Sequence, residues 1–183
     1  MTHAYFFGYG SLVNRNTHLY TPVRMARLPG WRRQWVATPH RGLCYLTAVK
    51  DEACAIDGLV AEVPGADWAA LDTRETGYDR HDTAVPGADH ATAIYAVPEQ
   101  SWQPHGPEHP ILLSYLDVVI AGYLSEFGTD GPQHFFETTS GWDAPVLNDR
   151  DAPLYPRAQP LTTPVRERVD DWLSSCKSTM LVT

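Results

Sequence analysis

The residues that constrain the fold most lie near the N-terminus, where an aromatic run meets a glycine-rich turn. The run Tyr5-Phe6-Phe7 is typical of a short buried strand, and Gly8-Tyr9-Gly10-Ser11-Leu12 follows it. Glycine allows the backbone to turn sharply and to approach a ligand closely. Backbone N–H groups that point the same way out of such a turn can hold a carboxylate or a polarised carbonyl oxygen. The stretch therefore predicts a strand that ends in a glycine turn. A ligand-binding loop is compatible with this stretch, but the motif taken alone favours an ordinary turn.

Two other glycine motifs do not fit this stretch. The run Gly8-Tyr9-Gly10-Ser11-Leu12-Val13 lacks the third glycine of the dinucleotide fingerprint G-x-G-x-x-G, and residues 14–18 are not an apolar-periodic helix. Ser11 is also not part of a G-x-S-x-G nucleophile elbow. The sequence therefore argues against both a dinucleotide site and a serine nucleophile.

The length and charge of the chain limit its organisation and its partners. A chain of 183 residues predicts a single domain spanning 1–183 that is large enough to bury a core. The formal net charge is -8 and no basic stripe is present, which argues against nucleic acid as a partner. No apolar segment approaches the length that spans a membrane, and the N-terminus lacks the pattern of a signal peptide. We therefore expect neither a nucleic-acid nor a membrane partner.

The cysteines and histidines do not form a recognisable metal-binding pattern. Cys44, Cys54 and Cys176 are odd in number and are not spaced as a metal pair. Reduced thiols of this kind are typical of a cytoplasmic protein, and we predict that location. His105 and His109 are four residues apart, but the prolines around them prevent a helix on which they would share a face. No pattern therefore supports a zinc site.

The first half of the chain is rich in strand patterns separated by glycine and proline. The pattern predicts two extended pieces around Pro29-Gly30 within 23–36, and a later strand over 91–97. Residues 43–49 and 56–63 read as a hairpin joined by the charged turn Lys50-Asp51-Glu52.

The second half is predominantly helical. Residues 111–127 carry a long apolar stripe, on which Tyr115 and Tyr123 are expected to pack in the core. Shorter helices are expected at 132–138 and 165–173. The proline-rich segment 142–164 has little periodicity and is predicted to wrap the surface as ordered coil.

A short helix between these halves carries an acidic residue on its apolar face. Trp68, Leu71 and Glu75 fall at i, i+3 and i+7, so Glu75 should face the core at the last helical turn. Desolvation should then raise the pKa of Glu75, unless Arg74 or Arg80 compensates. A solvated acid at a frayed helix end, paired with an arginine, fits the pattern equally well.

Three segments together resemble one protein family. They are residues 7–12 (FGYGSL), residues 32–35 (RRQW) followed by 40–42 (HRG), and residues 71–79 (LDTRETGYD). In this order they resemble the γ-glutamylcyclotransferase superfamily, and most closely its ChaC branch, which is specific for glutathione. The resemblance implies an α+β fold, namely a small, mixed, partly closed β-barrel with flanking helices. That fold agrees with strands in the first half and helices in the second.

The resemblance also implies an activity. Such an enzyme cyclises a γ-glutamyl group to 5-oxoproline and releases an amine, an amino acid or a dipeptide, with glutathione a leading candidate substrate. The nucleophile is the α-amine of the substrate itself, so no metal or cofactor is expected. By position, Glu75 corresponds to the catalytic acid–base residue. The substrate-binding residues implied in the same way are Tyr9, Gly10, Ser11, Leu12 and Tyr78.

The chain departs from the branch in ways that concern the substrate. The gap between Arg-Glu and Gly-Tyr is short, and residues 142–160 have no counterpart there. One alternative is therefore a cyclotransferase for γ-glutamyl amines or γ-glutamyl amino acids, and another is a non-catalytic small-ligand-binding domain on the same fold. Five arginines are candidates for binding a distal substrate carboxylate, although the sequence favours a surface salt bridge for each: Arg33, Arg41, Arg80, Arg150 and Arg157. The sequence makes no prediction about oligomeric state.

Overall fold

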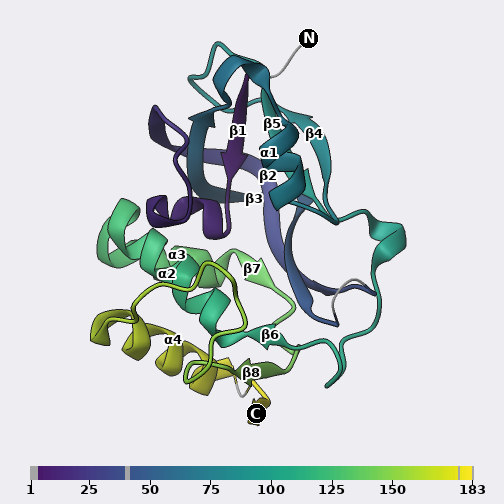
Figure 1. Ribbon diagram of the computed structural model, residues 1–183, viewed down its shortest axis with the longest axis vertical. Coiled ribbons are helices and arrows are strands. Elements are labelled where there is room, and N and C mark those ends of the chain that lie inside the picture. The colour runs from purple at the N-terminus through teal and green to yellow at the C-terminus, as the bar shows by residue number, and fades with distance from the viewer. Residues whose placement is uncertain (1–3, 40–41, 177, 183) are drawn as a thin grey trace.

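The computed structural model describes residues 4–39, 42–176 and 178–182 of the chain. A curled six-stranded sheet lies against a layer of helices (Figure 1). The sheet is mixed, with the order β4-β5-β1-β3-β2-β7, and its described residues do not pair the edge strands β4 and β7 with each other. Its strands are β1 (Tyr5–Gly8), β2 (Val23–Ala37), β3 (Cys44–Glu62), β4 (Asp79–Thr83), β5 (Thr92–Ala96) and β7 (Thr139–Ser140). The predicted α+β class is confirmed.

Strand β1 lies in the middle of the sheet and is buried on both faces. It pairs antiparallel with β3 and parallel with β5. Phe7 packs into the cluster shared with the helices, whereas Phe6 packs on the opposite face with Trp68 and Leu71. Burial on both faces explains why the run is aromatic throughout rather than alternating with polar residues. The loop that follows Gly8 therefore starts from a fixed point inside the molecule.

Strands β2 and β3 correct two predictions. The expected break at Pro29-Gly30 is a bulge inside one continuous strand, where the register shifts between Pro29 and Trp31. The expected hairpin at residues 50–52 is wrong, because both parts of β3 pair with β2 and not with each other. The charged residues form an irregular segment opposite the bulge, where Asp51 accepts a hydrogen bond of 2.7 Å from Arg32.

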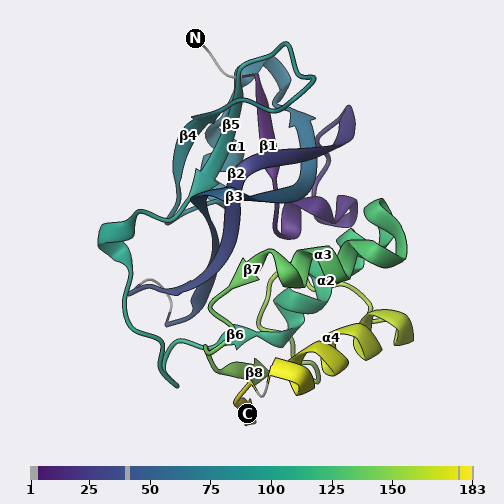
Figure 2. The same cartoon turned by 180° about the vertical axis from the view of Figure 1, so that it is seen from behind.

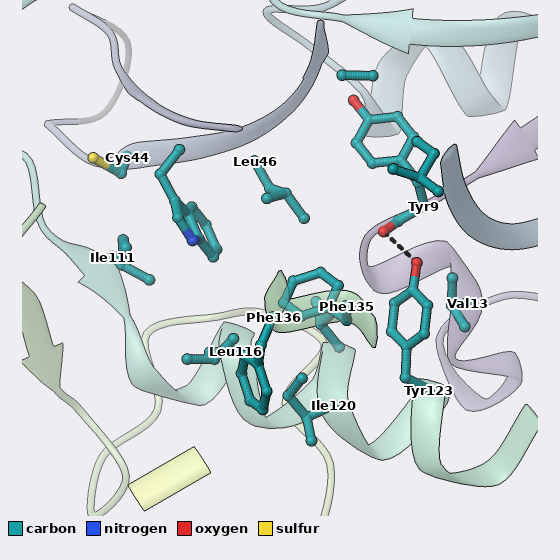
Figure 3. Close-up of a cluster of buried hydrophobic side chains, with 14 of the residues drawn as sticks. Tyr9, Val13, Cys44, Leu46, Ile111, Leu116, Ile120, Tyr123, Phe135 and Phe136 are labelled. Atoms are coloured by element: carbon teal, nitrogen blue, oxygen red, sulfur yellow. Dashed lines mark hydrogen bonds between the residues drawn. The ribbon is translucent and has the colours of Figure 1, made fainter. Parts of the chain in front are cut away.

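The helices are α1 (Ala69–Arg74), α2 (Leu113–Phe127), α3 (Gly131–Glu137) and α4 (Thr163–Cys176). Helices α2, α3 and α4 lie together on one side of the curled sheet (Figure 2), whereas α1 packs on the other face with Phe6. The three predicted helices of the second half are thus present, with somewhat different bounds. A buried cluster joins α2 and α3 to the sheet and to the loop after β1 (Figure 3). Among the described residues, no helix has the length and apolarity needed to cross a lipid bilayer.

The C-terminal tail is more ordered than its sequence indicates. Segment 142–164, predicted as coil, contains strand β8 (Val146–Asn148) and reaches the start of α4. Strand β8 lies between β6 (Ile111–Leu112) and β9 (Met180–Val182) in a parallel three-stranded sheet. The tail therefore packs along the N-terminal end of α2, where Ala144 and Val146 are fully buried.

Candidate active site

A cavity of about 210 Å³ lies between the glycine loop, the end of α1 and the tail. Five of its lining residues also border a smaller hollow that reaches the backbone of residues 7–12: Ser11, Leu46, Glu75, Tyr78 and Tyr115. The smaller hollow is therefore the inner end of the cavity. Its outer end is formed by residues 43–45 and 154–157.

Glu75 stands directly after α1 and faces the inner end of the cavity. Trp68 and Leu71 on the same face are buried, and the Glu75 side chain is 16% exposed. Its Oε1 accepts a hydrogen bond of 3.1 Å from Nε of Arg74. Desolvation raises the pKa of Glu75, although Arg74 and then Arg157 oppose the rise electrostatically. The sequence left open whether Glu75 faces inward or pairs with an arginine at the end of the helix. In the structure it does both.

Arg74 connects this acid to the loop after the first strand. Its side chain is 8% exposed. Nη1 donates to the carbonyl oxygen of Thr17 at 2.7 Å, and Nη2 lies 3.0 Å from Thr17 Oγ1 and 3.2 Å from Ser11 Oγ. Since these partners occupy the guanidinium, Arg74 holds the loop and the acid in one fixed arrangement.

The glycine loop fits tightly against α2. A Cβ atom at Gly8 would lie 2.6 Å from Cβ of Leu12, and one at Gly10 would lie 2.6 Å from the hydroxyl oxygen of Tyr115. The backbone of Ser11 lies near that same hydroxyl and partly offsets the rise in the pKa of Tyr115. Asn14 then fixes the end of the loop, because its Nδ2 donates to the carbonyl oxygen of Val118 at 2.9 Å. Both glycines are therefore required by close packing and not only by the turn.

The predicted binding residues do not all present their side chains to the cavity. The Tyr9 hydroxyl donates to the carbonyl oxygen of Tyr95 at 2.6 Å, and Leu12 packs in the cluster around Phe6. Tyr9, Gly10 and Leu12 border only the inner hollow, whereas Ser11 lines both spaces. Of these four residues, Ser11 is thus the one that lines the larger space.

Tyr78 lies beside Glu75 in the cavity wall. Its hydroxyl donates to the carbonyl oxygen of Leu46 at 2.9 Å. Burial raises the pKa of Tyr78 well above the ordinary value, so the phenol stays neutral and can act only as a neutral hydrogen-bonding group. The structure therefore brings Gly10, Ser11, Glu75 and Tyr78 together around the inner end.

Sequence reasoning missed several wall residues. Tyr115, expected to pack in the core, is half-buried, and its hydroxyl meets the loop. Its ring packs edge-on against Tyr155 of the tail, with ring centroids 5.0 Å apart. The only sequence feature that could have placed Tyr115 in the cavity wall is its hydroxyl group on the apolar face of the helix. No sequence feature indicates that Tyr155 lies there. On the opposite wall, Cys44 is a free thiol, and desolvation raises its pKa to about 12.

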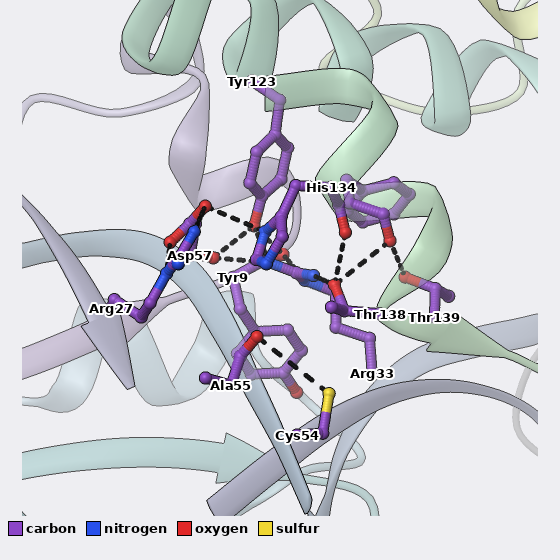
Figure 4. A network of polar contacts seen from close by, with 11 residues as sticks. Tyr9, Arg27, Arg33, Cys54, Ala55, Asp57, Tyr123, His134, Thr138 and Thr139 are labelled. Atoms are coloured by element: carbon purple, nitrogen blue, oxygen red, sulfur yellow. Dashed lines mark hydrogen bonds and ion pairs between the residues drawn. The ribbon is translucent and has the colours of Figure 1, made fainter. Parts of the chain in front are cut away.

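Arg33, within the RRQW segment, has a structural role. It is fully buried and stacks on Tyr123 and Phe135 (Figure 4). Its Nε donates to the carbonyl oxygen of Tyr9 at 3.1 Å, and Nη1 donates to Thr138 Oγ1 at 2.6 Å. Arg33 thus supports the loop from behind and lies outside the cavity lining.

The other candidate arginines differ in availability. Arg80 pairs with Asp72 at 3.0 Å, and Arg150 pairs with Asp117 at 2.7 Å. Arg157 lines the cavity, and within the described parts of the chain its guanidinium has no ion pair. Arg41, with His40, lies outside the described residues. No group of three or more His, Cys, Asp or Glu side chains in the described ranges is placed to hold a metal ion.

Comparison with solved structures identifies the fold. A gamma-glutamyl cyclotransferase is 14% identical with a TM-score of 0.60, over 92% of this chain and 98% of that one. An uncharacterized protein from Homo sapiens is 13% identical with a TM-score of 0.57, over 93% and 99% of the two chains. YkqA from Bacillus subtilis is 16% identical with a TM-score of 0.55, over 77% of this chain and 57% of that one. At these identities the likeness concerns the fold alone.

Sequence comparison identifies the family. No curated protein matches the chain. A family model described as gamma-glutamyl cyclotransferase, AIG2-like, matches residues 6–113, a range that contains all of β1 but Tyr5, the glycine loop, α1 and Glu75. The resemblance noted in the sequence is thereby confirmed at the level of the family. The chain belongs to the gamma-glutamyl cyclotransferase, AIG2-like family.

Proposed function

We propose that this protein is a γ-glutamylcyclotransferase that releases 5-oxoproline from a γ-glutamyl compound, with Glu75 as the acid–base residue. The observation that supports this most is the position of Glu75. Its enclosed carboxylate, with a raised pKa, faces the backbone of the glycine loop across the inner end of the cavity. One hollow thus combines a proton acceptor with a loop suited to hold a small polar group.

The reaction is an intramolecular aminolysis. Glu75 accepts a proton from the α-ammonium of the γ-glutamyl group, and the freed amine attacks the γ-carbonyl carbon. The new C–N bond closes the five-membered lactam, and the bond from that carbon to the departing nitrogen breaks. The attacking nitrogen loses two protons overall, and Glu75 passes them in turn to the departing nitrogen, which leaves as an ammonium group. Each transfer needs the carboxyl group within hydrogen-bond reach of both nitrogens.

The remaining groups supply orientation and charge stabilisation. Holding the amine against its own carbonyl removes much of the entropic barrier to ring closure. The negative charge on the carbonyl oxygen would be held by backbone N–H groups of residues 8–12, in the manner of an oxyanion hole. Ser11, Tyr78 and Tyr115 border the same space and are the side chains proposed to hold the glutamyl head.

The size of the cavity favours a compact substrate. Its volume of about 210 Å³ is below the roughly 300–1,000 Å³ typical of small-molecule sites. Glutathione stays a candidate substrate, and γ-glutamyl amino acids and γ-glutamyl amines are smaller alternatives. A non-catalytic binding domain has no evident use for a desolvated carboxylate, which costs stability. The enzyme is therefore the stronger proposal.

Product detection tests this proposal. The purified protein is incubated separately with glutathione, γ-glutamyl-alanine and γ-glutamyl-ε-lysine, and 5-oxoproline is measured by mass spectrometry. We expect release from at least one compound, and the pattern assigns the leaving group. Binding of these compounds without release would favour the binding domain, and neither release nor binding would limit the likeness to the scaffold.

A further inference from the structure

We infer that Arg157 makes the outer end of the cavity a site for the carboxylate of the leaving group. The preferred substrates are then γ-glutamyl amino acids, in particular those with apolar side chains, and not γ-glutamyl amines. The inference rests on the proposed function and concerns the outer wall formed by residues 154–157, which lie beyond the range matched by the family model.

The first support is the distribution of positive charge in the cavity wall. Two arginines of the described ranges line the cavity, Arg74 and Arg157. The guanidinium of Arg74 is occupied by Glu75, Ser11 and Thr17. Arg157 is half-buried, and it acts electrostatically on Glu75 without forming an ion pair with it within 4.0 Å. Among the described lining residues, Arg157 is thus the cation that is available to a ligand.

The second support is the way the tail is fixed. Asp149 is 1% exposed, and its carboxylate accepts hydrogen bonds from N–H and Oγ of Ser114 at the start of α2. The same carboxylate accepts the N–H of Leu154 at 2.9 Å, and Ser114 Oγ lies 3.3 Å from the Tyr155 nitrogen. The segment that carries Arg157 is therefore anchored to the helix that carries Tyr115. A positive charge on an anchored wall can select a ligand at little entropic cost.

The third support is charge complementarity. The charged side chains of the lining, over the described parts of the chain, are two arginines and Glu75, so this lining is net positive. A γ-glutamyl amino acid carries two carboxylates and one ammonium, and is net negative. A γ-glutamyl amine carries one of each, and γ-glutamyl-ε-lysine carries two of each, so both are neutral overall. Opposite net charge favours the first class of substrate.

The apolar surface of the outer end indicates the kind of side chain. Leu43 and Leu112 line it together with the rings of Tyr115 and Tyr155. Leu154, which is 58% exposed, also lies in this wall. A leaving amino acid with an apolar side chain would cover this surface, and burial of apolar area is favourable.

The test uses two substrates that differ only in the leaving-group carboxylate: γ-glutamyl-leucine and γ-glutamyl-leucinamide. Release of 5-oxoproline gives kcat/KM for each with wild-type protein and with Arg157→Gln, Arg157→Lys and Arg168→Gln. Arg168 lies on α4 outside the cavity lining and serves as the matched control. We expect wild-type protein to prefer the acid over the amide. Arg157→Gln should lower kcat/KM roughly 10- to 100-fold for γ-glutamyl-leucine and change it little for γ-glutamyl-leucinamide. Arg157→Lys should recover part of the loss. Arg168→Gln should leave kcat/KM unchanged for both substrates.

Two results would overturn the inference while leaving the proposed function intact. Equal losses on acid and amide in Arg157→Gln would place the guanidinium on the α-carboxylate of the glutamyl head instead. No loss on either substrate would show that Arg157 binds no substrate carboxylate. If wild-type protein releases no 5-oxoproline from any γ-glutamyl compound, the proposed function itself is wrong, and the inference falls with it.

Discussion

Arg74 holds the carboxylate of the residue next to it, with its Nε 3.1 Å from Oε1 of Glu75. The other nitrogens of the same guanidinium bind Thr17 and Ser11 across the cavity. A single side chain therefore fixes the distance between the acid and the glycine loop and also opposes the rise in the pKa of Glu75. Geometry and proton affinity at this site are coupled through Arg74.

The first prediction concerns pH. Glu75 must be ionised to accept a proton, and desolvation raises its pKa, so kcat/KM should fall as the pH drops through that raised pKa. The midpoint of this acid limb should lie above the value of about 4.3 for a free glutamate. A pH–rate profile of 5-oxoproline release measures it. A midpoint at or below the free value would contradict an enclosed catalytic carboxyl.

Arg74→Met sharpens this prediction. Loss of the guanidinium removes the largest of the interactions that lower the pKa of Glu75, so the acid limb should move to higher pH than in wild-type protein. A simple loosening of the loop would reduce kcat/KM without moving the limb. The position of the limb in the variant thus separates an electrostatic role of Arg74 from a purely structural one.

A second prediction concerns the contact between the glycine loop and α2. Gly10→Ala places a methyl group where the Tyr115 hydroxyl lies, so kcat/KM should fall about tenfold or more as the loop or the ring shifts. Tyr115→Phe removes that oxygen, and the nearest ring carbon lies 3.9 Å from the added Cβ. The double variant should therefore be more active than Gly10→Ala with Tyr115 intact. Strictly additive losses in this double-mutant cycle would refute the contact.

A third prediction concerns stability. Arg33→Met leaves the Tyr9 carbonyl and Thr138 without a charged donor in the core, and should lower the free energy of unfolding by roughly 2–4 kcal/mol. Arg33→Lys should recover little of the lost stability, since an ammonium group cannot reproduce the planar set of N–H donors of a guanidinium. Arg24→Met on the exposed part of the same strand is the control, and should stay within about 0.5 kcal/mol. Urea denaturation measures the free energy of unfolding of all three variants. Equal stability of Arg33→Met and Arg24→Met would refute the structural role of Arg33.

A fourth prediction concerns the anchor of the tail. Asp149→Asn replaces a carboxylate that accepts three hydrogen bonds by an amide with one acceptor oxygen, and should cost about 1–3 kcal/mol of stability. Because the anchored segment forms the outer wall, KM should rise more than kcat falls. Asp151→Asn, two residues further on and exposed, should behave as wild type. Unchanged KM in Asp149→Asn would separate the tail from substrate binding.

The local parts of the site follow from sequence because their patterns are local. An aromatic run before glycines marks a buried strand and its turn, and the spacing of Trp68, Leu71 and Glu75 fixes the face of a short helix. These patterns place the loop and the acid without knowledge of the rest of the chain.

The outer wall could not be predicted because it depends on contacts between distant segments. Ser114 and Asp149 are 35 residues apart, and nothing in the proline-rich tail indicates their hydrogen bonds. The hairpin prediction failed for a similar reason, since the partner of both halves of β3 is the long strand β2. Helical spacing put Tyr115 on the apolar face, but spacing alone does not distinguish a core from a cavity wall.

The most direct test of the account compares two enclosed glutamates. Glu126 is 12% exposed and pairs with Arg15 at 2.7 Å, but it lies outside the cavity. Glu75→Gln and Glu126→Gln each remove one such carboxylate, and thermal unfolding verifies that both variants fold. We predict that Glu75→Gln loses about a hundred- to ten-thousand-fold in 5-oxoproline release, while Glu126→Gln stays close to wild type. Folded Glu75→Gln with near wild-type turnover would contradict the central claim.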